Sequence, residues 1–212
     1  MSPAPGQEPS PVARQLRGPA AMGLADLAAI FDDLQFVLGC CERLLTELAR
    51  GEQRDDVVIE SLWDAALLTY ARCFQLGQRG LGLSVADLAK TELRGDVEQW
   101  HTMLVRLRDL LVDSTANPRE EFTVGATRSA TGAVDGVVIT SIVRPRVDEV
   151  TARQTGRLAF ELGKVVNDRM KSHQQTVFSI AAGLSTTDFD ELDPIDVDLS
   201  IAQQPDAGAR TP

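Results

Sequence analysis

The sequence is short of aromatic and cysteine residues, and each shortage narrows the range of folds and sites. Aromatic side chains make up 5% of the 212 residues. A core must therefore consist mainly of Leu, Val, Ala and Ile, which favours packed helices over a β-sandwich. The three cysteines, Cys40, Cys41 and Cys73, have no CxxC spacing. They predict buried, reduced thiols rather than a zinc site or a disulfide framework, as is typical of a cytoplasmic protein.

Long apolar runs and familiar enzyme signatures are also missing. No stretch approaches the roughly 18 uncharged apolar residues that a transmembrane helix needs, and the N-terminal region has no apolar segment as long as a secretory signal. The P-loop, GxGxxG, HExxH, GxSxG and paired-cysteine zinc motifs are absent. We therefore expect a soluble protein without a membrane segment, a cofactor or a metal. Most common enzyme classes are excluded in their recognisable forms.

Positive charge is scarce. The formal net charge is −10, and residues 186–212 hold seven acidic residues against one arginine. The body of the chain is thus near neutral to mildly acidic. This argues against broad binding of duplex DNA, because such binding needs a basic face that displaces counterions. It leaves room for a small basic pocket.

Apolar residues recur at steps of three and four over most of the chain, which predicts a mainly α-helical domain. Long amphipathic helices are expected at 24–51, at 55–77, at 96–114 and after Asp148, with a short helical segment at 84–90. Short connections between helices favour antiparallel neighbours. We therefore predict an up-and-down bundle of about four long helices within residues 22–185.

A change of period from near 3.6 to 2 after Pro118 predicts an inserted β-hairpin at about 121–144. The β-branched runs "EFTVGAT" and "GVVITSIV" flank "RSATGAVDG", in which Asp135-Gly136 is the turn signal. A two-stranded hairpin is marginally stable by itself, so we expect it to pack on another element.

The two ends of the chain are expected to be disordered tails, at 1–21 and 186–212. The first is rich in Pro, Ala and Gly and has no period. The second contains "DFDELDPIDVDL", in which acids alternate with apolar side chains. This alternation is typical of a disordered segment that docks in the groove of a protein partner. A solvating tail without a partner is the alternative.

Candidate functional residues gather in "QWHTMLVRLRDLLVDSTANPREEF", residues 99–122. His101 can move a proton near neutral pH, and Arg108 presents a fixed fork of donors to a phosphate. Arg72 and Arg79 add positive charge on and just after the preceding helix. If the two helices pack side by side, Arg72 and Arg108 flank one groove. Such a set of groups suits the cleavage of RNA phosphodiesters.

The same residues also have structural interpretations. Arg72 can pair with Asp109 or Asp64 across or along the helices. On the surface such a pair contributes less than about 1 kcal/mol to stability, and it contributes more only if it is buried. His101 is expected to be a half-buried or exposed helix residue. His173 lies on the apolar face of the last helix and is expected to be a core histidine with satisfied hydrogen bonds.

Two stretches, "SLWDAALLTYARCFQLGQR" and "WHTMLVRLRDLLVDSTANPREEF", resemble a group of uncharacterised bacterial proteins of HEPN-like type. The resemblance covers roughly residues 55–121 and rests on short motifs, "YARCF" and "RD". It implies a small helical bundle. Many HEPN domains are metal-independent ribonucleases that act as dimers in toxin–antitoxin and phage-defence systems, with an arginine and a histidine in their site.

In this group the helix carries an Arg-Asp pair and ends in His-Ser before an Asn and an acidic residue. Arg108, Asp109, Asn117 and Glu120 match that pattern, whereas Ser114 stands in the place of the histidine. Serine cannot serve as an acid or base near neutral pH as imidazole does. The resemblance therefore implies a degenerate ribonuclease site, in which the Arg-Asp pair serves the fold or a retained contact.

We accordingly expect a catalytically silent binding protein that acts as a homodimer through its long helices. The resemblance implies a retained contact with RNA or a nucleotide, in a stress or phage-defence setting. The residues expected to bind are Arg72, Arg79, Arg108, Asp109, Ser114 and Asn117.

Two alternatives stay open. The first is an active, metal-independent endoribonuclease in which Arg108 and His101 are catalytic. His101 lies seven residues before Arg108, about 10 Å along a helix, so the two groups would have to meet across a dimer. The second is an adaptor that a protein partner recruits through the acidic tail at 186–212.

Overall fold

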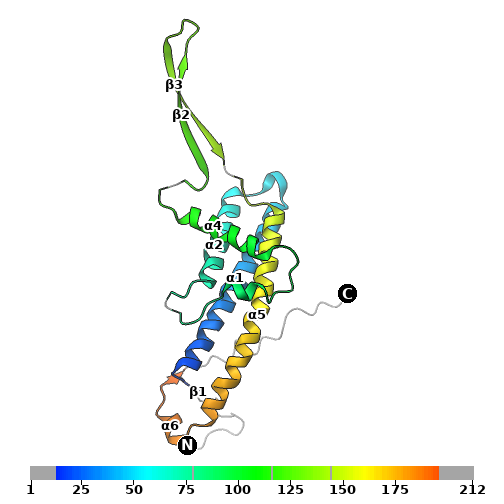
Figure 1. The fold of residues 1–212 in the computed structure, drawn as a ribbon, viewed down its shortest axis with the longest axis vertical. Helices are drawn as coiled ribbons and strands as arrows, with labels where there is room; N and C mark the ends of the chain where they lie inside the picture. The colour runs from blue at the N-terminus through cyan, green and yellow to red at the C-terminus, as the bar shows by residue number, and fades with distance from the viewer. Residues whose placement is uncertain (1–12, 78, 116, 144, 196–212) are drawn as a thin grey trace, which may run out of the picture.

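Two long helices, α1 (Pro19–Leu48) and α5 (Glu149–Ala182), pack against each other and form the axis of the computed structural model (Figure 1). The structure describes residues 13–77, 79–115, 117–143 and 145–195. The other elements are β1 (Ala13–Arg14), a 3-10 turn (Gly51–Gln53), α2 (Asp56–Cys73), α3 (Val85–Leu88), α4 (Val97–Val112), β2 (Glu120–Arg128), β3 (Val134–Val143), α6 (Thr186–Asp190) and β4 (Pro194–Ile195). The prediction of a mainly helical protein is confirmed.

Helix α1 carries the apolar stripe on which the core is built. Its residues Leu27, Ile30, Leu34 and Val37 follow three- and four-residue steps, and each is 0% exposed. They share one core cluster with a matching stripe of α5, formed by Leu158, Leu162 and Val166. Among the residues that the structure describes, no helix combines the length and the apolarity needed to cross a membrane.

The main helix contacts run in the order α5, α1, α2, α4. Tyr70 of α2 and Leu104 of α4 belong to the same buried cluster as the α1 stripe. Aspartates set the starts of three helices, because the side chains of Asp55, Asp96 and Asp148 each accept hydrogen bonds from backbone N–H groups of the first turn. The finer arrangement, an up-and-down bundle of four helices, stays a prediction.

Both ends of the described chain are folded, and they pair with each other. Strand β1 pairs antiparallel with β4. Arg14 donates from Nη1 to the carbonyl oxygen of Leu192 at 3.0 Å, and Arg17 forms an ion pair with Asp193. The segment that follows α5 therefore turns back onto the segment that precedes α1.

The predicted disorder of the two tails, 1–21 and 186–212, is therefore wrong for the parts that the structure describes, 13–21 and 186–195. The rest of each tail lies outside the described residues. Local signals explain the difference, since α6 begins with a Ser-Thr-Thr-Asp capping box and α1 has a proline in its first turn. A truncation that spares β4 has to fall after residue 195.

Strands β2 and β3 form the predicted hairpin, which projects from the helical body as an arm, residues 120–143 (Figure 1). Glu120 at the start of β2 lies opposite Val143 at the end of β3, so the pairing extends to the base of the arm. No residue of either strand is buried. The expectation that the hairpin packs on another element of the chain is therefore wrong.

The reverse turn of the arm lies at residues 129–133 and not at the predicted Asp135-Gly136. Gly132 adopts a φ of 86°, which glycine reaches without steric cost. The N–H of Ser129 donates to the carbonyl oxygen of Ala133 at 2.8 Å and closes the turn. Asp135 and Gly136 stand within β3, next to a shift in the register of the two strands.

Two glycines of α5 allow a matched test of the α1–α5 packing. A Cβ at Gly156 would lie 3.0 Å from the Cβ of Cys41, whereas a Cβ at Gly163 would meet nothing nearer than 3.6 Å. We expect Gly156→Ala to lower the free energy of unfolding by about 1 kcal/mol through overpacking. Gly163→Ala should raise it by up to about 1 kcal/mol, because alanine favours the helix. Urea unfolding measures both, and equal gains for the two variants would contradict the close packing.

Candidate functional site

Two of the predicted binding residues, Arg72 and Arg79, converge on a carboxylate of α1. Arg72 donates from Nε to Oδ2 of Asp33 at 3.1 Å and also binds its Oδ1, and Arg79 donates from Nη2 to Oδ2 at 2.9 Å. The Asp33 side chain is 8% exposed. The expected pairing of Arg72 with Asp109 or Asp64 is therefore wrong.

The charge state of Asp33 follows from this arrangement. Burial raises the pKa of its carboxyl, but the hydrogen bonds and positive charges of Arg72 and Arg79 outweigh burial and hold the pKa below its ordinary value of 3.8. Asp33 is thus ionised at neutral pH. Its negative charge neutralises part of the positive charge of Arg72 and Arg79 that a bound phosphate would need. The two arginines are engaged within the fold.

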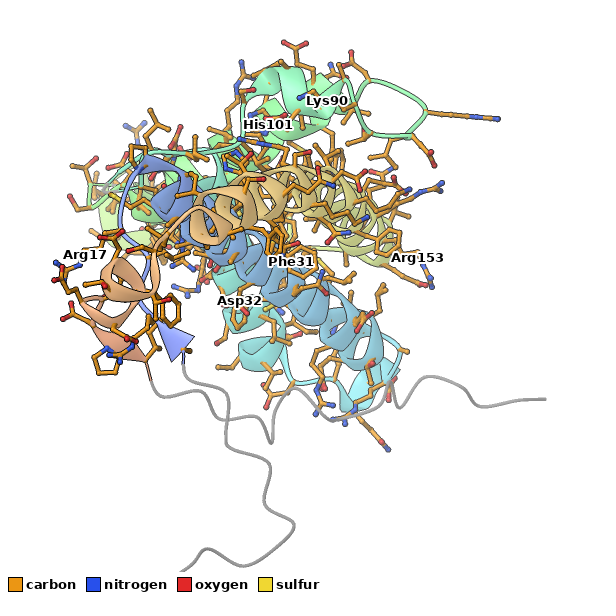
Figure 2. The ribbon with its side chains drawn as sticks, turned by 90° about the horizontal axis from the view of Figure 1, so that it is seen from below. Arg17, Phe31, Asp32, Lys90, His101 and Arg153 are labelled. Carbon is orange, nitrogen blue, oxygen red and sulfur yellow. The ribbon has the colours of Figure 1, made fainter. Side chains whose placement is uncertain are left out.

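His101 is buried, which corrects the expectation of a half-buried or exposed residue. Its Nδ1 lies 2.8 Å from the hydroxyl of Tyr70, and its ring centroid lies 4.3 Å from that of Phe74. Burial lowers the pKa of the imidazole, so it is neutral near pH 7. Figure 2 shows His101 well apart from Asp32, which lies on the surface of α1. The position suits a core residue that a substrate does not reach.

Arg108 lies on α4 and faces the end of α2. Its Nη1 and Nη2 each lie 3.1 Å from the side-chain oxygen of Gln75, with the amide oriented to accept, and its Nη2 lies 3.2 Å from Asp109. The group formed by Asp33, Arg72 and Arg79 is here called the Asp33 cluster. No hydrogen bond or ion pair among the described residues joins Arg108 to His101 or to the Asp33 cluster. The structure thus brings Arg72 and Arg79 together and leaves Arg108 and His101 in separate environments.

The described residues between α4 and β2 turn the chain toward the arm, and they place no acid or base beside Arg108. Ser114 is exposed in a turn. The side-chain oxygen of Asn117 accepts hydrogen bonds from the backbone N–H groups of Arg119 at 2.8 Å and Glu120 at 3.2 Å, which turns the chain into β2. Asn117 therefore has a structural role at the base of the arm.

The remaining histidine and the cysteines show no site of their own. His173 is half-buried rather than part of the core, and its Cε1 would lie 3.2 Å from a Cβ placed on Gly23. Cys40, Cys41 and Cys73 are buried and unpaired with one another, as predicted. Burial raises the pKa of Cys41 and of Cys73 to about 12, so both thiols stay protonated. Within the described ranges, no cluster of His, Cys, Asp or Glu has the grouping needed to hold a metal ion.

The base of the arm is tied to α2 by a cluster of ion pairs, here called the root cluster. Asp56, Glu60 and Asp64 lie on one face of α2 at four-residue spacing. Arg146, after β3, pairs with Asp56 and with Glu60 at 3.6 Å, and Arg119, before β2, pairs with Glu60 at 2.7 Å and with Asp64 at 3.8 Å. The spacing of the three acids can be read from the sequence. Their pairing with the two arginines that flank the hairpin cannot, because it depends on how the base of the arm meets α2.

A cavity of about 370 Å³ lies beside the root cluster, between α2, α4 and the base of the arm. Trp63 and Leu107 contribute to its apolar wall, and Asp64 and Arg119 to its polar rim. Burial raises the pKa of Asp64, and the attraction of Arg119 does not outweigh it. The predicted site residues line neither this cavity nor a second one near Trp100 and Arg157.

The two faces of the arm differ in chemistry because side chains alternate along a strand. One face, here called the apolar face, carries large apolar side chains that are 57% to 74% exposed. Its members are Phe122, Val124, Val134, Val137, Ile139 and Val143. The other face, here called the threonine face, carries Thr123, Thr127 and Thr140, and only two large apolar side chains, Val138 and Ile142. The period-2 alternation of the sequence already predicts this division. The structure adds that no other element of the described residues covers the apolar face.

No family model, no curated protein and no solved structure matches this chain. The HEPN-like resemblance therefore stays a prediction. The function has to be inferred from the arrangement of the residues themselves.

The Asp33 cluster predicts a pH-dependent stability. Asp33→Asn should lower the free energy of unfolding by about 2 kcal/mol at pH 7, less than for a fully buried pair because Arg72 is 57% exposed. Because the folded pKa of Asp33 is depressed, its contribution is present above the ordinary pKa of 3.8 and is lost as the pH falls through the folded value. Urea titrations between pH 7 and pH 3 measure this. Asp32→Asn, an exposed neighbour, is the control and should change little; a pH-independent loss in Asp33→Asn would contradict the charge argument.

Proposed function

We propose that this protein works by binding rather than by catalysis, and that it acts as a homodimer. The observation that carries the proposal is the arm, which holds its apolar face in solvent at the end of a helical body. Monomeric proteins rarely expose a contiguous apolar patch of this kind, and such patches mark interaction sites. A face that no element of the described chain covers is suited to a partner.

The candidate catalytic groups support the absence of catalysis, because each is engaged within the fold. Arg72 and Arg79 bind the buried carboxylate of Asp33. His101 is held against Tyr70 in the core. An acid or base within hydrogen-bond reach of the phosphate is the first requirement of phosphodiester cleavage by such a site, and Arg108 has Gln75 and Asp109 as its neighbours instead of an imidazole.

The same geometry gives a retained RNA or nucleotide contact less support than association. Arg72 is 57% exposed and keeps part of its guanidinium toward solvent. Its charge is shared with Asp33, however, and Arg108 is only 21% exposed. A phosphate would have to compete with these internal partners, so weak and salt-sensitive binding is the most that these arginines offer.

The proposal predicts that the purified protein does not cleave RNA. A mixed RNA pool incubated with the full chain in EDTA should stay intact, and Arg108→Ala and His101→Ala should behave as the unchanged chain does. Arg106→Ala, at an exposed position of the same helix, is the control for the loss of an arginine outside the candidate site, and cleavage by all variants alike would indicate a contaminating nuclease. Cleavage that Arg108→Ala and His101→Ala abolish and Arg106→Ala retains would establish the ribonuclease alternative. Light scattering on the same preparation reports the dimer.

A further inference from the structure

The apolar face of the arm has no partner within the described chain, and its size and charges indicate which kind of partner could cover it. Strands of this length make a ribbon of about 30 Å, at roughly 3.3 Å per residue. Two such faces in contact would supply a large part of the roughly 800 Å² per partner that a standard protein interface buries. The edges of the ribbon add unpaired backbone groups, which natural proteins seldom leave open on a flat apolar strand.

The charges on the apolar side of the arm are self-complementary. Glu120 at the base and Arg128 at the tip project on the same side as Val124, because all three occupy alternate positions of β2. Val124 lies midway, four residues from each charge. A partner with a strong charge of one sign would meet like charge at one end of this face. The same face of a second copy, running in the opposite direction, would meet opposite charge at both ends.

From this complementarity we infer that the apolar face of the arm is the dimer interface, and that its occupant is the same face of a second copy of this chain. The two arms run antiparallel across a two-fold axis near Val124 and its cross-strand partner Ile139. Arg128 of each copy then lies beside Glu120 of the other, twice in the dimer. A parallel alignment would instead bring like charges together, which is unfavourable. The inference rests on the proposed homodimer and assigns its interface to the arm, instead of to the long helices as expected from the sequence.

A charged side chain at the axis tests the surface. Ile139→Glu places a carboxylate on the apolar face, where the two-fold axis would bring it against the same group of the second copy. We expect the dissociation constant of the dimer to rise by about a hundredfold or more. Thr140→Glu introduces the same charge at the next residue of β3, on the threonine face, and should leave the dimer intact. Light scattering and sedimentation of the full-length chains over a range of concentrations measure both.

The possible results separate the surface from the homodimer itself. An unchanged chain that is dimeric, with only Ile139→Glu monomeric, supports the inference. A dimer that persists in Ile139→Glu overturns the inference and leaves the proposed homodimer standing on another surface. A monomeric unchanged chain overturns both, and the arm then serves a different protein. Loss of the dimer in both variants overturns the assignment to one face. Circular dichroism checks that the helical body, which buries no residue of the arm, stays folded.

A charge exchange tests the antiparallel direction. Arg128→Glu and Glu120→Arg should each raise the dissociation constant by about tenfold, because each places like charges together at both ends of the interface. The double variant should restore the original value. Failure of the double variant to recover, with both single variants weakened, would overturn the antiparallel alignment.

Cross-linking gives a second readout of the same alignment. Packed sheet faces lie about 10 Å apart, so a bismaleimide of matching length should link two copies of Val124→Cys and should not link two copies of Thr123→Cys. The native cysteines are buried and give little background. Equal linking of the two variants would contradict the assignment of the interface to the apolar face.

Discussion

The close packing of α1 against α5 is the constraint on which the rest of the structure depends. The two helices approach so closely at Gly156 that a Cβ there would lie 3.0 Å from Cys41. This contact aligns the apolar stripes of the two longest helices; α2 then packs on α1, and α4 packs on α2. Because α1 also carries Asp33, the same helix that organises the core places a carboxylate where it meets Arg72 and Arg79.

The arm depends on this body only at its base. The root cluster joins α2 to the residues that flank the hairpin, and its side chains are 27% to 58% exposed, so salt partly screens their attraction. Above the root, the two strands are held by their own hydrogen bonds, and a two-stranded ribbon is marginal in water. Burying a Val, Ile or Phe side chain contributes about 1.5 to 3 kcal/mol. The six large side chains of the apolar face therefore represent a stabilisation that the described part of one chain does not use.

Sequence periodicity was sufficient for the helices and for the hairpin, because each face of these elements has a consistent chemistry. It could not determine which polar groups meet. Arg72 was expected to pair along α2 or with α4, and it pairs with Asp33 on α1, a contact between residues 39 apart in the chain. The burial of His101 depends on Tyr70 of α2 and on Phe74, the residue that follows α2. Compositional bias also misled, since the acidic segment that begins at residue 186 contains a capped helix and a strand.

The two halves of the molecule thus satisfy opposite requirements. In the body, the charged groups that would attract a phosphate are paired internally, and the imidazole that would move a proton is buried and neutral. On the arm, large apolar groups are exposed to solvent and have no partner among the residues that the structure describes. Selection for catalysis would be expected to leave an acid or base accessible beside an arginine; selection for association would be expected to leave an apolar surface accessible and its charges matched. The distribution of paired and unpaired groups among the described residues follows the second pattern, which is the one that the proposed function requires.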